Sequence, residues 1–412
     1  MNDLLKLCKC VEETSDNFIG VKYNDGNIDI IFPLGYRIPK EKKELICSIK
    51  QLFKLIKVVH EKKLDFSNNG DFTDDSNGLP IDSYQWIIND YLNNGVYVDI
   101  EKIYHQENKG KINWKRTFKT PFLVNKKSLV YLNPIVEKKT NIKNIISEIY
   151  AYCVDESTKV LWFLYDKVKK VSSNKNANIK YYINIIDGEI NNTFDDRKKL
   201  LLYHMKRILQ EKISTEGKNE IRNYGIRNFE YVWEYIINSI YGTENVKKYY
   251  PTATYCLNCV PSFEASKLRP DTIMKDLNNN MYILDSKYYK VGTTSNNLKN
   301  IKEMLPNTDS IQKQITYGKF MEQNFKEKDN INDIYNAFVL PFNKTNNDFN
   351  LSDDINYLGY SICNWEDIEL SRDSKFYKIA LIFIDTRYLI NCYFDKVCEK
   401  ELLINRINEI NK

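Results

Sequence analysis

Three residues in the second half of the sequence have the types and spacing expected of a metal-dependent hydrolytic site. Asp285 and Lys287 are two residues apart in a β-type run, MYILDSKYY, so their side chains are expected on the same face of a strand. Asp271 follows Pro270 in a second β-type run, LRPDTIMKD. Two carboxylates and an ammonium group on one face would suit hydrolysis of a phosphodiester bond.

The two runs are joined by a turn-like tetrad, Leu277-Asn278-Asn279-Asn280, so the sequence predicts a β-hairpin. In a hairpin centred on this tetrad, the residue numbers of opposed positions sum to about 557, which places Asp271 within one residue of facing Asp285. Opposed side chains begin roughly 4.5 to 5.5 Å apart. The two carboxylates could therefore share a divalent cation, and Lys287 could reach the same point.

Magnesium is the cation that this arrangement favours. Mg²⁺ binds through one or two carboxylates, keeps several waters and takes other ligands from substrate phosphates. Lys287 would position or help deprotonate the attacking water, or stabilise the pentavalent phosphate. The alternative is an exposed hairpin with an ordinary surface ion pair, because an acid two residues before a base is expected roughly eight times in this composition.

An amphipathic helix, ended by Gly242, is expected before the hairpin. Glu230 and Glu234 flank its apolar stripe. The stripe consists of Phe229, Val232, Trp233, Ile236, Ile237 and Ile240. Further helices are expected within residues 41–60, 142–165 and 195–213, and a hairpin within residues 18–32 around Asn24-Asp25-Gly26.

A basic segment between residues 101 and 144 holds eleven basic and three acidic residues, a net charge of +8 in a chain whose formal net charge is +5. Its run GKINWKRTFK interleaves aromatic residues with cations, which suits phosphate contact and base stacking. Lys111, Lys115 and Arg116 are candidate phosphate contacts, and Trp114 is a candidate base contact. The alternative is a solvated lysine-rich face.

Nine cysteines are scattered through the chain, and this odd number favours reduced thiols over a disulfide framework. Cys256 and Cys259 form the only CxxC pair, and because no second ligand pair is evident, these thiols are expected in the core and not at a zinc site. No apolar run is long enough to cross a bilayer, and the N-terminus lacks a secretory pattern. We expect a cytoplasmic protein with no membrane association.

The runs RPDTI and YILDSKYY, separated by a short turn, resemble the PD-(D/E)XK nuclease superfamily. Most of the chain resembles the LlaJI-type restriction endonucleases, which are similar to the McrC nuclease subunit. The matching segments, in order, are IIFPLGY (30–36), GKINWKRT (110–117), FEYVWEYI (229–236), KQITY (313–317) and LIFIDTRYLI (381–390). The core motif is shared by many nucleases, so it supports the superfamily more firmly than the subgroup.

The resemblance implies roles for individual residues. Asp271 and Asp285 would bind Mg²⁺, or Mn²⁺ in its place, and Lys287 would be the catalytic lysine. Glu234 matches the helix acid that often completes such sites, although its place off the apolar stripe equally fits a solvated helix residue.

Two residues of a later helix also match the family pattern. Gln314 and Tyr317 match a QxxxY-like helix that contacts substrate, although the spacing here is QxxY. The alternative is a pair that flanks the core, on a helix buried through Ile311, Ile315 and Phe320.

The implied fold is α/β, with a restriction-endonuclease-like mixed sheet flanked by helices. We expect this nuclease domain over residues 140–412, after a smaller α+β domain over residues 1–139 that binds DNA or a partner. The implied function is a restriction endonuclease that hydrolyses double-stranded DNA in a host-defence system, with a companion DNA methyltransferase.

Three alternatives remain for the function. The first is a nuclease subunit that acts only with a GTP-dependent, McrB-like partner; no GxxxxGK[ST] run occurs in the sequence, so that other chain would hydrolyse the nucleotide. The second is a non-catalytic DNA-binding subunit, against which the intact Asp271, Asp285 and Lys287 argue. The third is a nuclease of repair or transposition.

Overall fold

The computed structural model describes residues 2–14, 17–24, 27–62, 78–125, 128–142, 144–165, 168–169, 171–174, 176–215, 222–291, 293, 301–365 and 374–411. The chain folds into two units. The discontinuous unit consists of Met1–Asp74 and Gly225–Lys412, and the inserted unit consists of Asp75–Tyr224. This division differs from the expected boundary between residues 139 and 140, because the N-terminal segment folds with the C-terminal half of the chain.

A five-stranded mixed sheet organises the discontinuous unit, and the expected α/β class with helices around a mixed sheet is confirmed. Its strands, in spatial order, are β12 (Thr272–Lys275), β13 (Met281–Ser286), β14 (Ile334–Phe342), β16 (Ile379–Asp385) and β15 (Ile355–Ser361). The three central strands are parallel, whereas β12 and β15 are antiparallel edges. All of β14 is buried, which explains why its sequence is a nearly continuous apolar run.

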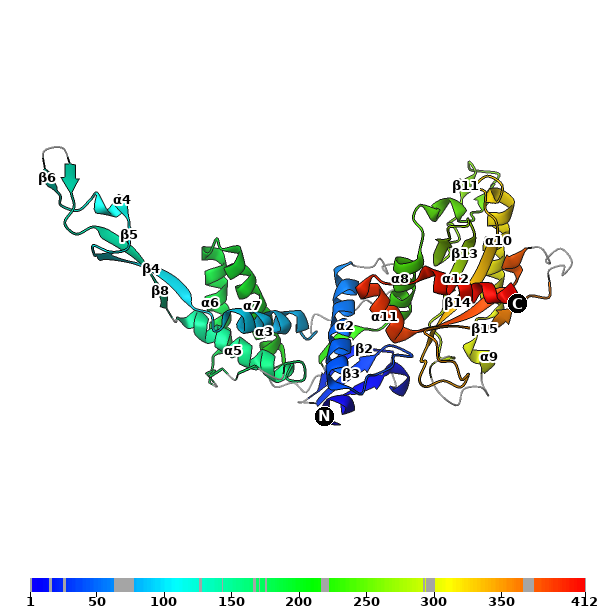
Figure 1. Ribbon diagram of the computed structural model, residues 1–412, viewed down its shortest axis with the longest axis horizontal. Coiled ribbons are helices and arrows are strands. Elements are labelled where there is room, and N and C mark those ends of the chain that lie inside the picture. The colour runs from blue at the N-terminus through cyan, green and yellow to red at the C-terminus, as the bar shows by residue number, and fades with distance from the viewer. Residues whose placement is uncertain are drawn as a thin grey trace. The chain divides into compact units, whose positions relative to one another are not determined.

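Helices cover both faces of this sheet (Figure 1). Ile283 of β13 shares one buried apolar cluster with Ile315 and Met321 of α10 (Thr308–Phe325). α8 (Phe229–Tyr241) packs against β12 and β13, and the expected amphipathic helix is thereby confirmed. α11 (Thr386–Asp395) packs against α8, and α12 (Lys400–Asn408) packs against β15 and β16.

The N-terminal segment adds a second sheet to the discontinuous unit. Its spatial order is β1 (Cys8–Cys10), β3 (Asn27–Phe32), β2 (Ile19–Asn24) and β9 (Arg222–Ile226), and α2 (Lys42–Glu61) packs on β2. The expected hairpin and helix are confirmed as β2–β3 and α2, although residues 25–26 of the turn lie outside the described residues. In β9, a Cβ on Gly225 would lie 2.1 Å from the Ile19 carbonyl oxygen, so this close approach requires glycine.

The turn after β3 is bound directly to the C-terminal half. The backbone N–H of Leu34 donates to the Tyr288 hydroxyl at 2.6 Å, and the Leu34 carbonyl accepts from the Thr386 hydroxyl at 2.8 Å. Gly35 follows with φ of +70°, and a Cβ there would lie 3.1 Å from the Phe342 carbonyl oxygen. These contacts explain why residues 1–74 and 225–412 form one unit.

Four helices form the inserted unit's core: α3 (Ile81–Asn94), α5 (Ile145–Val160), α6 (Ile179–Asn192) and α7 (Asp196–Thr215). α5 and α7 confirm the helices expected within residues 142–165 and 195–213. The backbone N–H of Leu79 donates to the Asn223 carbonyl at 3.1 Å, so the two ends of the unit lie side by side. Adjacent ends are typical of a domain inserted into another.

A β-arm, residues 99–142, lies between α3 and α5 in the sequence. β4 (Asp99–Gln106) pairs antiparallel with β8 (Ile135–Ile142) along its whole length. The rest of the arm comprises β5 (Lys111–Ile112), α4 (Trp114–Thr117), β6 (Leu123–Asn125) and β7 (Ser128–Val130). The arm carries most of the basic segment; Lys126, Lys127 and Lys143 of that segment lie outside the described residues.

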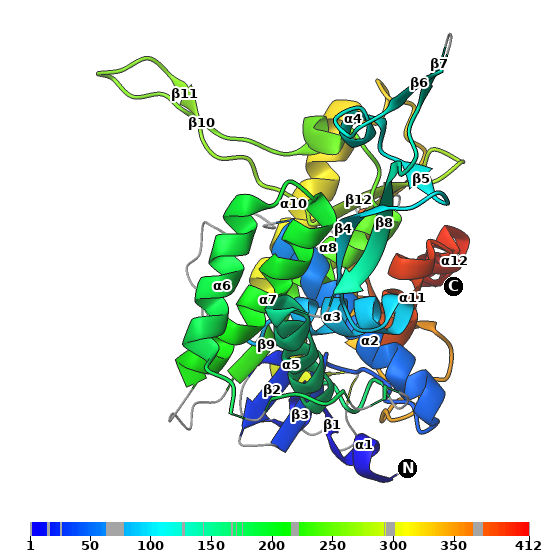
Figure 2. The same ribbon diagram turned by 90° about the vertical axis from the view of Figure 1, so that its left-hand side faces the viewer.

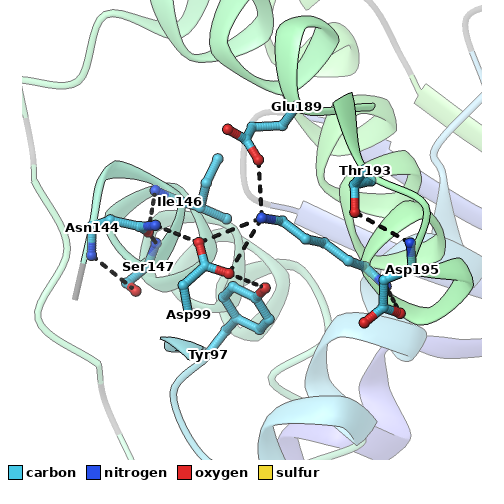
Figure 3. Close-up of polar contacts among 9 residues, drawn as sticks. Tyr97, Asp99, Asn144, Ile146, Ser147, Glu189, Thr193 and Asp195 are labelled. Carbon is cyan, nitrogen blue, oxygen red and sulfur yellow. Dashed lines mark hydrogen bonds and ion pairs between the residues drawn. The ribbon is translucent and has the colours of Figure 1, made fainter. Parts of the chain in front are cut away.

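Polar contacts fasten both strands of the arm to the helices (Figure 3). Asp99, at the start of β4, accepts from the Tyr97 hydroxyl at 2.7 Å and from the Asn144 side chain, which also caps α5. Lys198 of α7 lies 3.3 Å from the Asp99 carboxylate and 2.9 Å from that of Glu189 in α6. Burial raises the pKa of Asp99, but the hydrogen bonds and Lys198 outweigh it and lower the pKa overall. Asp99 is therefore a charged anchor.

The remaining elements are short. They are α1 (Asn2–Lys6), α9 (Ile301–Met304), β10 (Thr254–Tyr255), β11 (Phe263–Glu264) and the 3₁₀ helices at Val11–Glu13, Val246–Tyr249, Lys375–Tyr377 and Glu409–Asn411. Among the residues that the structure describes, no helix combines the length and apolarity needed to cross a membrane. The expectation of core thiols is wrong for Cys47, Cys256 and Cys259, which are exposed.

Candidate active site

The predicted catalytic residues lie on the hairpin of β12 and β13. Ile273 faces Ile283, and all pairs of this hairpin have residue numbers that sum to 556, within one of the expected 557. Continuing the register by one position places Asp271, just before β12, opposite Asp285 in β13. The sequence therefore predicts both the hairpin and the pairing of its two acids.

The surroundings of Asp271 disfavour the charged form of its carboxyl group. Its Oδ2 accepts the backbone N–H of Ser286 at 2.8 Å, which fixes the carboxyl against β13. Burial, followed by the charges of Asp285 and Glu234, raises the pKa of Asp271 well above its ordinary value. Interaction with the Asp285 carboxyl contributes to this rise in the pKa of Asp271, and the Ser286 N–H opposes it. The site thus brings together three acidic side chains, Asp271, Asp285 and Glu234.

Lys287 supplies the compensating cation. Its Nζ lies 2.8 Å from Oδ2 of Asp285, and its backbone N–H donates to the Val339 carbonyl of β14 at 2.9 Å. Burial alone lowers the pKa of Lys287, but the Asp285 and Asp271 carboxylates outweigh it and raise the pKa overall. Lys287 is therefore an ammonium ion at neutral pH.

Glu234 of α8 contributes a third acid. Burial, followed by the charge of Asp285, raises the pKa of Glu234 to about 6, while Lys287 and Arg269 lower it. Its side chain is partly buried, so the alternative of a fully solvated helix residue does not hold. Arg269 was not among the residues that the sequence singled out.

Gln314 and Tyr317 of α10 are both buried, with 1% and 6% of their surface exposed. Tyr317 belongs to the apolar cluster beneath the sheet, which agrees with the core-flanking alternative. Burial, followed by the charges of Asp271 and Asp285, raises the pKa of Tyr317 to about 12. Tyr317 therefore also lies near the acids, and its contact with substrate stays a prediction.

The donor set fits a divalent cation that prefers oxygen ligands. Asp271 and Asp285 are hard carboxylate donors, and a cation between them would relieve the repulsion that raises the pKa of Asp271. Within the described part of the chain, no three His, Cys, Asp or Glu side chains form a group that could hold a metal. Glu234 is thus not placed as a third ligand, and water and a phosphate oxygen would complete a Mg²⁺ shell.

Four of the six predicted DNA contacts lie on the arm of the inserted unit, and the side chains of Lys111, Lys115 and Arg116 are exposed. The Arg116 guanidinium lies 3.8 Å above the Tyr104 ring, which orients it without neutralising its charge. Trp114 is 53% exposed. All four groups are available to a partner.

The sequence alone did not reveal which distant residues contact the hairpin of β12 and β13. The residue after Lys287, Tyr288, is half-buried, and its hydroxyl accepts a hydrogen bond from the backbone N–H of Leu34, which lies 254 positions earlier. A run such as IIFPLGY shows that a segment is apolar, but no periodicity identifies a partner so distant in the sequence.

Comparison with known proteins found a matching family model and similar solved structures. Residues 18–385 match the family model described as LlaJI restriction endonuclease. No curated protein matches the chain. Among solved structures, the chain is similar to one described as the refined half-complex from a tetradecameric assembly of Thermococcus gammatolerans McrB AAA+ hexamers with bound McrC. That match has 13% sequence identity and a TM-score of 0.36, and covers 94% of this chain and 82% of the other.

Proposed function

Because this chain belongs to the LlaJI restriction endonuclease family, we propose that it hydrolyses phosphodiester bonds of double-stranded DNA at Asp271, Asp285 and Lys287, with Mg²⁺ or Mn²⁺ as cofactor. The observation that carries the proposal is the hairpin register, which sets the two acids opposite each other and Lys287 at 2.8 Å from Asp285. The proposed setting is host defence, with a companion DNA methyltransferase.

The roles of the side chains follow from their charges. Asp271 and Asp285 would hold the metal, which when bound lowers the pKa of an attacking water and stabilises charge on the phosphate. Lys287 is already protonated, so it would place a positive charge on the phosphate and not accept a proton. Glu234, with a pKa of about 6, would accept a proton from the water, because a base of this pKa is suited to proton transfer near neutral pH.

A second candidate function is a nuclease subunit that works with a separate GTPase. The observation that favours it is the far end of the arm, where β6 and β7 expose apolar side chains, including Val124 at 73% and Leu123 at 56%. Apolar patches of this kind suit a protein partner better than DNA phosphates. A GTPase encoded beside this chain should therefore be included in the assays.

The catalytic prediction is that Asp271→Ala, Asp285→Ala and Lys287→Ala each lower the cleavage rate by at least about two orders of magnitude, as the loss of one charge-stabilising group does elsewhere. Glu234→Gln should lower it less. DNA affinity should change little, because these groups act on charge that develops during the reaction. Calcium should support binding without cutting, because its bonds are longer and its geometry looser.

Cleavage of a labelled duplex and electrophoretic mobility shifts would measure both properties. Glu401→Gln, an exposed acid on α12, is the control and should cut normally. If the Asp285→Ala variant cleaves DNA at the wild-type rate in the presence of any partner GTPase, the active site lies elsewhere.

A further inference from the structure

A small hairpin precedes the catalytic one and has no role in the site described above. We name residues 252–264 the thiol hairpin; in it β10 and β11 pair only through Thr254 with Glu264 and Tyr255 with Phe263. Figure 2 shows this ribbon extending away from the other elements of its own unit. Its loop contains Cys256 and Cys259.

The thiol hairpin has no core of its own. All thirteen of its residues are exposed, including Tyr255 at 54% and Phe263 at 49%. A contact between these two rings, with centroids 5.4 Å apart, and a backbone hydrogen bond of 2.7 Å from Ala265 to Ala253 hold its strands together. An isolated two-stranded hairpin is marginally stable in water. A ligand or partner that cross-links this hairpin would therefore stabilise it.

The side chains of the loop indicate that a metal ion could stabilise the hairpin. Cys256 and Cys259 are free thiols, both exposed, with the spacing that supplies two of the four ligands of a tetrahedral thiolate zinc site. Metal cross-links of this kind stabilise elements that lack an apolar core, because binding energy then contributes directly to folding. An exposed pair of reduced thiols without a metal would instead be open to oxidation.

The other two ligands do not come from the unit that carries the hairpin. All nine cysteines and three histidines of the chain lie within the described ranges, yet none joins this pair in a metal-binding group there. The remaining cysteines of the unit are buried or partly buried, apart from Cys47 on α2. Among the described residues, the pair therefore has only two of the four ligands that a tetrahedral zinc site needs.

We propose that the thiol hairpins of two copies of this chain bind one zinc ion between them, each contributing Cys256 and Cys259. A second copy supplies the missing thiol pair with matching geometry, in the self-complementary arrangement of a two-fold dimer. The hairpin carries a single charged residue, Glu264, so two hairpins meet with little repulsion. Their exposed apolar residues would cover one another. These are Tyr255, Leu257, Val260 and Phe263.

The position of the hairpin indicates what the dimer would do for catalysis. This step of the inference rests on the proposed function. Only residues 265–270 separate the thiol hairpin from Asp271. Joining two such hairpins brings together two chains with one active site each, and a DNA duplex has two strands to be cut. Zinc binding itself depends on neither Mg²⁺ nor DNA, so the two proposals can fail separately.

The test uses the full-length chain, reduced and stripped of metal, to which zinc alone is added. We expect one zinc ion per two chains by elemental analysis and a shift from monomer to dimer by light scattering. Cobalt in place of zinc should give the absorption spectrum of a tetrahedral four-thiolate site. Each thiol loses its proton on coordination, so binding should weaken as the pH is lowered.

Cys256→Ser combined with Cys259→Ser should abolish zinc binding and dimer formation, and circular dichroism should show an unchanged fold because neither side chain is buried. Cys47→Ser, which removes another exposed thiol, should behave as wild type. The proposal is overturned if wild-type chain binds no zinc, binds one ion per monomer, or forms a zinc-dependent dimer that the double variant retains.

Discussion

At the scale of single residues, Glu12 shows how closely the N-terminal segment packs against the C-terminal half. Burial raises the pKa of Glu12 to about 7, although Lys290 opposes the rise, and its Oε2 has no hydrogen-bond partner in the part of the chain that the structure describes. The folded chain therefore binds the Glu12 proton more tightly than the unfolded chain does. The stabilising contribution is complete below pH 4.5, the ordinary pKa, and is lost as the pH rises through about 7.

We predict that Glu12→Gln, which cannot ionise, removes this loss. We compare the unfolding free energy of the variant with that of wild type at each pH. Between pH 4.5 and about pH 8 this difference should move by roughly 3 kcal/mol in favour of the variant, as a pKa shift of this size implies. Urea unfolding at several pH values would measure it. Glu401→Gln, which removes an exposed acid of α12, is the control. Parallel pH curves for Glu12→Gln and wild type would contradict the prediction.

At the scale of elements, the sequence predicted local structure well. The hairpin of β12 and β13 was predictable with its register, because the turn Leu277-Asn278-Asn279-Asn280 and the flanking apolar runs are contiguous. α2, α5, α7 and α8 were predictable from helical spacing for the same reason. The pairing of Leu34 with Tyr288 and Thr386 was not, since it spans 254 and 352 positions and leaves no periodic pattern.

The thiols show a second kind of limit. Cysteine is among the residues most often buried, so the sequence favoured core positions for Cys256 and Cys259. Only the structure reveals that the hairpin holding them lacks any layer to pack against. Two-residue strands carry too few side chains for an alternating pattern to be recognised.

The arm is the element that we expect to grip DNA. We predict that replacing Lys111, Lys115 and Arg116 together by alanine weakens DNA binding and reduces the slope of log affinity against log salt by up to about 3, one for each phosphate that a removed cation would have neutralised. Binding titrations at several salt concentrations would measure the slope. The Asp99 anchor lies at the other end of the arm, so the fold should survive the change.

The matched control replaces three exposed lysines of or near α2, Lys40, Lys43 and Lys54, by alanine. It makes the same change in charge, so general electrostatics would affect both variants alike. If both triple variants show the same slope of log affinity against log salt, the arm is a solvated basic face and not a DNA-binding surface.

At the scale of the whole molecule, the chain is a discontinuous unit into which another unit is inserted. The mixed sheet, the hairpin of β12 and β13 and the Leu34 contacts all belong to the discontinuous unit. The hydrogen bond from Leu79 to Asn223 brings together the points where the inserted unit begins and ends. Each unit therefore has the connectivity of an independent domain.

We predict that residues 78–221 can be replaced by a short glycine-serine linker without unfolding the rest. The shortened chain keeps β9 and should unfold cooperatively, with the metal-dependent chemistry retained and most of the salt-dependent DNA affinity removed together with the arm. Thermal unfolding and the duplex cleavage assay would measure these properties. An insoluble or non-cooperative product would mean that the units stabilise each other.

The Leu34 contacts also bear on how the chain is made. The N-terminal strands leave the ribosome first, yet Leu34 bonds a hydroxyl that is synthesised 352 residues later. At a synthesis rate of roughly 5 to 20 residues per second, Thr386 is added on the order of tens of seconds after Leu34. A chain terminated before Ile379 lacks both this bond and all of β16. Incomplete translation products would thus lack a finished sheet, which would protect the cell that makes them from a DNA-cutting fragment.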